Sequence, residues 1–362
     1  MRDARQLFWI AVTLGGMSLA GAQALAAERT MVYISAGGDN RVVLWELDPQ
    51  SGALEPRGQL DLEGAPGAMT NDPTRQVLYV GVRSKNSVAA LAINPQDGQL
   101  KPLGMTPVAD NPVYLATDKQ GRHLLTAYYG AAKAAIYPIK SDGTIGSEAT
   151  SLVMTDKNPH SIQADPSNRF VFVPNTGADK VLQFKFDAAE GTITPNSPPE
   201  LSTGTGTGPR HFWFHPSRDY VYFVNEKGSS VTACRLDKQS GTLAALQTIP
   251  TLPGDFTGNN TCAHIETTPD GKYLYASNRG HDSLAVFSID AETGKLTSLG
   301  QQPTEKTPRA FAIDPSGKFL IAAGQGSNQL AAYRVGQDGR LQPLAVYPGG
   351  KSPAWVQIVP LK

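Results

Sequence analysis

Short runs of hydrophobic residues recur along the whole chain, and many of them alternate with polar residues. Alternation is clear in Lys180–Phe186 (KVLQFKF) and Gln329–Val335 (QLAAYRV), whereas Tyr220–Val224 (YVYFV) is continuously apolar. A period of two indicates a strand with one buried face, and a short apolar run between turns indicates a strand buried on both faces. Turn sequences such as Asp-Pro-Ser and Asp-Gly separate the runs. The pattern therefore predicts an all-β protein made of many short antiparallel strands.

The runs belong to one repeating template, which is plain when Pro209–Glu226 (PRHFWFHPSRDYVYFVNE) is set against Pro308–Gln325 (PRAFAIDPSGKFLIAAGQ). Successive copies start 46, 47, 50, 53, 46 and 45 residues apart. The copies begin at Pro66, Pro112, Pro159, Pro209, Cys262, Pro308 and Pro353.

A second signature gives an independent count of the units. Seven turns read Gly-x-Leu or Gly-x-Ile, at Gly52, Gly98, Gly143, Gly191, Gly241, Gly294 and Gly339. Four-stranded units with a period near 45 residues are typical of propeller blades. The last copy lacks most of its strands, and Met31–Leu47 supplies them if the ring is closed by joining the two ends of the chain. We therefore expect a seven-bladed β-propeller with four antiparallel strands per blade. A two-domain β-sandwich is the alternative, but it does not predict a single period.

The template separates scaffold positions from positions that differ between blades. One such column follows the leading Pro, and a second lies 17 residues after it, where the second strand of each copy ends. Antiparallel strands joined by a short turn bring these two ends to the same level, so both columns should ring one mouth of the central channel. The first column reads Gly67, Val113, His160, Arg210, Ala263, Arg309 and Ala354; the second reads Arg83, Tyr129, Thr176, Glu226, Arg279 and Gln325, with Gly37 from the N-terminal half-blade.

Three consecutive blades contribute the charged members of these columns: His160, Arg210, Glu226 and Arg279. Arginines suit recognition of a carboxylate, a phosphate or a developing oxyanion, and a His with a carboxylate can transfer protons near neutral pH. We interpret these four residues as catalytic, with Arg83 and Arg309 as substrate-binding residues further around the ring. The plainer alternative is that they form ion pairs that finish the strand ends.

Other candidates are weaker. His123, His211, His215 and His281 have no partner at metal-binding spacing, and His215 occupies the Asp place of the Asp-Pro-Ser turn, which indicates a structural role. The segment GTGTGPR (Gly204–Arg210) lacks the Lys-Ser/Thr and the helix of a phosphate loop. We predict no metal site and no Ser-His-Asp or Cys-His nucleophile.

The composition limits partners and compartment. With 32 basic and 32 acidic residues, nothing favours binding to nucleic acid or to an anionic membrane surface. Residues 1–26 combine Arg2 and Arg5, a short apolar run and small residues at Ala24 and Ala26, the pattern of a secretory signal. We expect residues 27–362 to form a single propeller domain in the periplasm, free of the membrane after cleavage; an uncleaved anchor is the alternative. Cys234 and Cys262 fall in different repeats, which favours free thiols over a disulfide.

The chain resembles a known family in GPRHFWFHP, PHSIQADPSNRFVFVPN, LYASNRGHDSLAVF and PRAFAIDPSGKFLIAAGQ. These motifs are similar to those of the seven-bladed lactonases, which include the propeller-type 6-phosphogluconolactonase and the fungal carboxymuconate lactonizing enzyme. The resemblance spans the mature chain and implies a catalytic centre at one channel mouth, with no cofactor and no metal. It places the family's His, first Arg, Glu and second Arg on His160, Arg210, Glu226 and Arg279.

One feature departs from this family, and a neighbouring segment concerns the same blade. Where it usually reads acidic-Ile-His, this chain reads His264-Ile265-Glu266, and Pro253–Asn260 (PGDFTGNN) leads into the same blade. Both could alter the mouth and with it the preference for substrate.

We expect an exported lactonase that opens an unphosphorylated sugar lactone such as glucono-1,5-lactone, because phosphorylated sugars are cytosolic. The alternatives are a 6-phosphogluconolactonase, a muconate-type lactonizing or cycloisomerising enzyme, and a non-catalytic propeller that binds a partner at its channel face.

Overall fold

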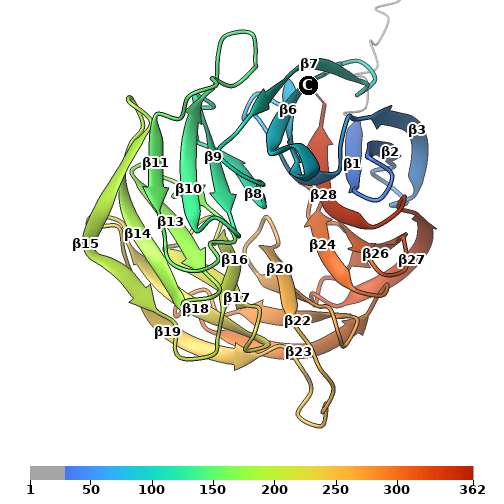
Figure 1. The fold of residues 1–362 in the computed structure, drawn as a ribbon. Helices are drawn as coiled ribbons and strands as arrows, with labels where there is room; N and C mark the ends of the chain where they lie inside the picture. Colours follow the sequence, from blue (N-terminus) through green and yellow to red (C-terminus); the bar gives the residue numbers. More distant parts are fainter. Residues whose placement is uncertain (1–28, 362) are drawn as a thin grey trace, which may run out of the picture.

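The computed structural model describes residues 29–361, and the expected signal peptide lies outside them. Seven four-stranded antiparallel sheets are arranged in a ring around a central channel (Figure 1). The expected fold class, blade count and number of strands per blade are therefore confirmed. The only helix among the described residues is one short 3-10 turn, η1 (Arg83–Lys85).

The blades are numbered here from the first complete one. Blades 1 to 3 consist of β4 (Pro66–Asn71), β5 (Val77–Val82), β6 (Ser87–Ile93) and β7 (Leu100–Pro107); β8 (Tyr114–Thr117), β9 (His123–Tyr128), β10 (Lys133–Pro138) and β11 (Ser151–Met154); and β12 (Gln163–Ala164), β13 (Phe170–Asn175), β14 (Lys180–Asp187) and β15 (Thr192–Ser202). Blades 4 to 6 consist of β16 (Pro209–Phe214), β17 (Tyr220–Asn225), β18 (Ser230–Asp237) and β19 (Thr242–Pro250); β20 (Cys262–Thr267), β21 (Tyr273–Asn278), β22 (Ser283–Ile289) and β23 (Leu296–Pro303); and β24 (Pro308–Ile313), β25 (Phe319–Gly324), β26 (Gln329–Val335) and β27 (Leu341–Pro348).

Blade 7 joins the two ends of the chain. It consists of β28 (Pro353–Pro360), β1 (Thr30–Ala36), β2 (Arg41–Leu47) and β3 (Leu54–Asp61), in that order across the sheet. Ile34 of β1 lies opposite Val43 on one side and Val356 on the other. The predicted closure is confirmed, and it leaves no open end in the ring for another chain to extend.

Burial follows from the place of each strand in the ring. The first strands of neighbouring blades contact one another around the channel. The second strands are buried along almost their full length, and β17 along all of it, because neighbouring blades cover both of their faces. This double burial explains why YVYFV is continuously apolar, since a strand covered on both faces has no solvent side. The fourth strands, such as β27, expose most of their residues on the outer rim.

The repeated glycine turns are joints between blades. Gly241 has φ +70° and lies against the start of the second strand of the preceding blade, where a Cβ atom would come within 2.0 Å of the Phe170 ring. In four blades the glycine carbonyl of the turn also accepts a hydrogen bond from a buried tyrosine hydroxyl of the preceding blade. These pairs are Tyr33–Gly98, Tyr79–Gly143, Tyr222–Gly294 and Tyr275–Gly339. The signature that counted the blades is thus the contact that holds them together.

Both cysteines are buried free thiols, as expected. Cys262 occupies the place of the template proline, and its Sγ lies 3.2 Å from the side chain of Asn278. Within residues 29–361 there is no helix long and apolar enough to cross a membrane.

Candidate active site

The two columns meet at one level, as the template predicts. In six of the seven blades the residue after the second strand donates its backbone N–H to the segment that precedes the first strand. The N–H of Glu226 donates to the carbonyl of Gly208 over 2.7 Å, and that of Arg279 donates to Thr261 over 2.9 Å. In blade 3 the first strand is shortened to β12, and Pro159 pairs with Asn175 through an isolated bridge, which still places His160 at this level.

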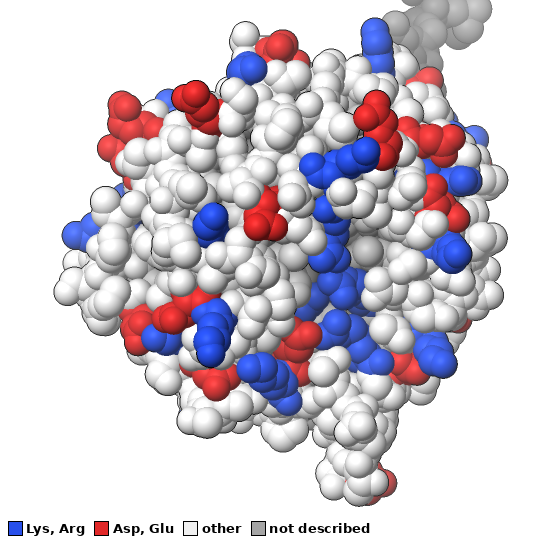
Figure 2. All heavy atoms as spheres, viewed as in Figure 1, with Lys and Arg blue, Asp and Glu red and all other residues white. Residues whose placement is uncertain are grey.

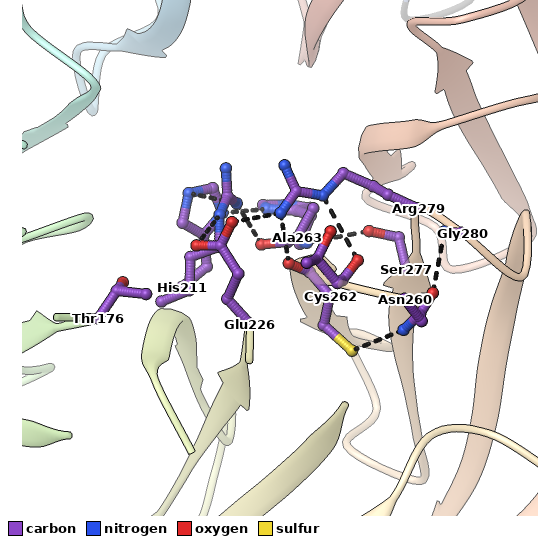
Figure 3. A network of polar contacts seen from close by, with 12 residues as sticks. Thr176, His211, Glu226, Asn260, Cys262, Ala263, Ser277, Arg279 and Gly280 are labelled. Atoms are coloured by element: carbon purple, nitrogen blue, oxygen red, sulfur yellow. Dashed lines mark hydrogen bonds and ion pairs between the residues drawn. The ribbon is translucent and has the colours of Figure 1, made fainter. Parts of the chain in front are cut away.

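A carboxylate between two guanidinium groups forms the centre of the site. Glu226 follows β17, and its two oxygens are divided between neighbours: Oε1 accepts a hydrogen bond from Nη2 of Arg279, and Oε2 lies 3.4 Å from Nε of Arg210. Figure 3 shows the Arg279 guanidinium extending over Cys262 and Ala263 toward Glu226. Arg279 is held from below by the Cys262 carbonyl, 3.1 Å from its Nη2. Three of the four predicted catalytic residues are therefore in direct contact.

Arg210 is the most deeply buried of these groups, with 1% of its surface exposed. Its Nη1 donates to the Ala263 carbonyl and to Nε2 of His211. Its own backbone carbonyl accepts a hydrogen bond from the Ser161 hydroxyl over 2.7 Å. Burial, together with the charges of Arg309 and Arg279, holds the pKa of Arg210 well below the ordinary arginine value, while Glu226 acts in the opposite direction. Glu226 is thus the group that compensates the buried charge.

His160 lies beside this cluster and is also buried. Its ring packs edge-on against Tyr129 and His211, with centroids 5.3 Å and 5.2 Å away. Burial holds the pKa of His160 well below its usual value of 6.5, and the charges of Arg210 and Arg309 act in the same direction. Its buried Nδ1 has no hydrogen-bond partner within residues 29–361. The imidazole is therefore neutral at pH 7 and retains a lone pair that can accept a proton.

Arg83 and Arg309 complete a basic mouth. Together with Arg210 and His160 they line a small cavity in the channel. Nε of Arg83 donates to Asn111 over 3.0 Å, whereas no hydrogen bond or ion pair from residues 29–361 holds the Arg309 guanidinium. Burial lowers the pKa of Arg309 to about 10, and the neighbouring charges of Arg279 and Arg83 act in the same direction. Figure 2 shows basic side chains in a strip across the middle of the face seen there.

His211 is a weak candidate in the sequence because it has no partner at metal-binding spacing, and regular alternation along a strand would turn its side chain away from that of Arg210. The pairing of β16 with β17 shifts between Pro209 and Phe212, so a bulge lies at Arg210 and His211. A bulge re-aims side chains, and both of these consecutive residues line the same cavity. The available signal was a His at the second position after the leading residue in two consecutive copies, His211 and His264, next to Arg210 in the first of them.

Below this mouth the channel is closed by an aromatic layer. Tyr114 and Trp355 contact the ring of His211 at centroid distances of 5.0 Å and 5.7 Å, and Trp355 lies 5.5 Å from His264. On the other side of the layer is a second hollow of about 310 Å³, which Glu266 helps to line. The site thus opens to one face of the ring.

Two of the weaker histidine candidates, His215 and His123, are structural. Nδ1 of His215 accepts the backbone N–H of Ser217 and Arg218, as an Asp does in the equivalent turns. His123 packs edge-on against Phe186 and stands against the Gly191 turn. Among the described residues no group of three or more His, Cys, Asp and Glu is placed to hold a metal ion.

Two loops near the site have clear roles. In the segment Gly204–Arg210, the N–H groups of Gly206 and Gly208 donate to the carboxylate of Asp179, so the protein itself uses these donors. In Pro253–Asn260, the side-chain oxygen of Asn260 accepts the N–H groups that directly follow Arg279. This second segment therefore supports the strand end that carries Arg279.

The fold and the mouth define a class: a seven-bladed propeller with clustered arginines, one carboxylate and a neutral imidazole at a closed channel. Such a set can stabilise an oxyanion and move a proton without a metal. The family described as "Lactonase, 7-bladed beta-propeller" matches residues 30–358. The chain belongs to this family and is a lactonase.

Individual relatives agree with this assignment. A 6-phosphogluconolactonase of Serratia proteamaculans is 35% identical over 91% of this chain and 99% of its own length. A 6-phosphogluconolactonase of Yersinia pestis is 37% identical over 90% of this chain and 97% of its own. Among solved structures, the periplasmic gluconolactonase of Pseudomonas aeruginosa superposes with a TM-score of 0.84 over 92% of this chain and 99% of that one. It shares 24% of its residues with this chain, so it supports the fold alone.

Proposed function

We propose that the protein hydrolyses glucono-1,5-lactone to the aldonic acid at the mouth formed by His160, Arg210, Glu226 and Arg279. The observation that carries the proposal is the division of the Glu226 carboxylate between two guanidinium groups. This arrangement fixes both cations at one point while the neutral His160 stands beside them. Fixed donors aimed at a developing negative charge are usually the largest contribution to acyl-transfer catalysis.

In the proposed reaction the ring carbonyl of the lactone points toward Arg210 and Arg279. A water molecule attacks the carbonyl carbon, and His160 takes its proton. The bond from that carbon to the ring oxygen then breaks, and the proton passes from His160 to the ring oxygen, so the sugar acid leaves with a free hydroxyl. Glu226 holds the two guanidinium groups in position throughout. We favour His160 over Glu226 as the base because both Glu226 oxygens already face arginines.

The choice of an unphosphorylated lactone rests on residues 1–26, which carry the pattern of a secretory signal. An enzyme in the periplasm meets sugar lactones formed by oxidation outside the inner membrane. We therefore propose a periplasmic enzyme.

A second candidate substrate is 6-phosphoglucono-1,5-lactone. The mouth holds four guanidinium groups and one carboxylate, and Arg309 is free of any hydrogen-bond partner among the described residues. Excess arginine charge suits a phosphate group. The relatives named 6-phosphogluconolactonase favour the same substrate.

The deciding experiment measures opening of both lactones by the purified protein, with the spontaneous rate subtracted. Activity on glucono-1,5-lactone that exceeds activity on the phosphorylated lactone supports the first candidate. If the phosphorylated lactone is preferred, Arg309→Ala should raise KM for that substrate and leave KM for glucono-1,5-lactone unchanged. No acceleration of either lactone would refute the proposal and favour a propeller that binds a partner. Intact-mass measurement of protein from the periplasmic fraction tests the expected start of the mature chain near Ala27.

A further inference from the structure

Four side chains form a continuous polar chain across the aromatic layer of the channel. Nη1 of Arg210 lies 3.1 Å from Nε2 of His211, whose Nδ1 lies 2.8 Å from Nδ1 of His264. Nε2 of His264 is 3.1 Å from Oε1 of Glu266. The chain starts at the candidate active site and ends at the hollow on the opposite side. All four side chains are buried.

The direction of each hydrogen bond follows from chemistry. A guanidinium group has only donors, so Nε2 of His211 must be the acceptor and must carry no proton. A neutral His211 then carries its proton on Nδ1 and donates it to Nδ1 of His264. His264 in turn carries its proton on Nε2 and donates it to Glu266. The other oxygen of Glu266 accepts the backbone N–H of Ile313 over 2.9 Å, so every member has a partner.

If the direction of any of these hydrogen bonds were reversed, the hydrogen bond between Arg210 and His211 would be lost. If His264 carried its proton on Nδ1, two N–H groups would face each other across 2.8 Å. His211 would then have to carry its proton on Nε2, which would point an N–H at the Arg210 guanidinium. The carboxylate of Glu266, on the far side of the aromatic layer, accepts a hydrogen bond from Nε2 of His264 and therefore excludes this arrangement. Burial and the charge of Arg210 also hold the pKa of His211 well below 6.5, which keeps that ring neutral.

We propose that His211, His264 and Glu266 are positioning residues, which hold the Arg210 guanidinium in place for lactone opening by fixing the proton positions of both imidazoles. This inference rests on the proposed function. None of the three needs to touch the substrate, and their effect should appear in turnover because Arg210 acts on the transition state.

The test begins with proton positions, which are measured without substrate. The chain has six histidines, so labelling their ring nitrogens and recording long-range 15N–1H spectra resolves each ring, with single His variants for assignment. We expect His211 to carry its proton on Nδ1 and His264 to carry its proton on Nε2. A His211 protonated on Nε2 in the wild-type protein would overturn the proposal, whatever the activity shows.

Kinetics on the preferred lactone form the second arm. In Glu266→Gln the side chain has only one oxygen acceptor for two donors, Nε2 of His264 and the backbone N–H of Ile313, each of which has its own carboxylate oxygen in the wild type. We therefore expect kcat to fall about 10- to 100-fold with little change in KM, as for a small misplacement of a catalytic group. The double variant His264→Asp with Glu266→His should restore most of the loss. In that variant the new carboxylate at position 264 would accept hydrogen bonds from His211 and from the new imidazole at position 266. The remaining nitrogen of that imidazole would accept the Ile313 N–H.

His215→Asp is the matched control, because it changes a buried histidine outside the chain to the residue that other blades carry at that turn. It should keep the wild-type kcat. Wild-type kcat in folded Glu266→Gln, or a double variant no better than Glu266→Gln, would contradict the proposal. A wild-type protein inactive on both lactones would instead refute the proposed function, while the proton positions would still decide whether the three residues orient Arg210.

Discussion

Arg210→Lys separates the geometry of the site from its charge. The substitution keeps a cation in the blade 4 strand, but lysine carries its donors on one nitrogen instead of a planar fork. Arg210 uses that fork in two directions: Nη1 faces the Ala263 carbonyl and His211, while Nε lies 3.4 Å from Glu226. A single ammonium group cannot contact the acceptors on both sides of the guanidinium. We expect it to move toward Glu226, where the charge attracts it, and to leave the other two acceptors.

The size of the effect follows from these contacts. Losing one donor to an oxyanion typically costs about 10²–10³ in kcat. KM should change much less, because the interaction belongs to the transition state. His211 and the Ala263 carbonyl would lose their partner in the interior, and each unsatisfied group costs about 1–3 kcal/mol. The melting temperature should therefore fall by several degrees while the protein remains folded at the assay temperature.

The assay is steady-state kinetics on the preferred lactone, with spontaneous hydrolysis subtracted and a thermal melt for each variant. Arg309→Lys is the matched control, since it makes the same change in the same column of another blade. Arg309 has no hydrogen bond to lose within residues 29–361, so its kcat and melting temperature should change far less than those of Arg210→Lys. A near-normal kcat for Arg210→Lys, or a larger loss for Arg309→Lys, would show that the catalytic centre lies elsewhere in the ring.

Three further predictions concern stability and reactivity. The folded pKa values of His160 and His211 lie well below 6.5, so below about pH 6.5 the unfolded chain binds protons that the folded chain does not. The free energy of unfolding should therefore fall as the pH falls, by up to about 1.4 kcal/mol per pH unit for each group. Thermal melts across this range should show a weaker dependence of stability on pH in His160→Gln, and an unchanged dependence would contradict the assignment. Burial raises the pKa of Cys234 to about 12 and that of Cys262 to about 11, so neither thiol should react with a disulfide reagent until the protein is unfolded, when both should. Gly241→Ala should lower the melting temperature without altering KM, because φ is +70° and the new Cβ would lie 2.0 Å from the Phe170 ring. A variant as stable as the wild type would show that the contact between these blades can move apart to admit the methyl group.

The scaffold was predictable from the sequence because each feature that builds it occurs once per blade. The period gave the number of blades, and the glycine turns gave it again. The level of the two columns was also predictable, since it depends only on antiparallel pairing at the strand ends. Arg210, Glu226 and Arg279 were brought together for this reason and are in contact in the structure. Their roles in catalysis remain predictions.

The polar chain behind Arg210 was not predictable by the same argument. Alternation assigns Arg210 and His211 to opposite faces of a strand, but the bulge between Pro209 and Phe212 brings both into the channel. The pairing of β20 with β21 shifts in the same way between Cys262 and Ile265, next to His264. Bulges depend on local hydrogen bonding that the hydrophobic pattern does not record. The exchanged His264 and Glu266 were noticed as a departure, but their contact with His211 required coordinates.

The placement of the chemistry explains how one ring can carry a costly site. A buried guanidinium beside other arginines destabilises the folded protein unless its donors are satisfied. Here the compensation comes from the hydrogen bonds of Nη1 to Ala263 and His211, and from the charge of Glu226, which lies 3.4 Å from Nε. Ala263 and His211 stand on first strands, and Glu226 stands at the end of a second strand. The joints between blades lie at the glycine turns, away from the channel mouth. Changes at the mouth should therefore alter turnover with modest loss of stability, whereas changes at the joints should lower stability and leave KM intact. That separation follows from a repeat whose shared positions build the ring and whose blade-specific positions face the channel.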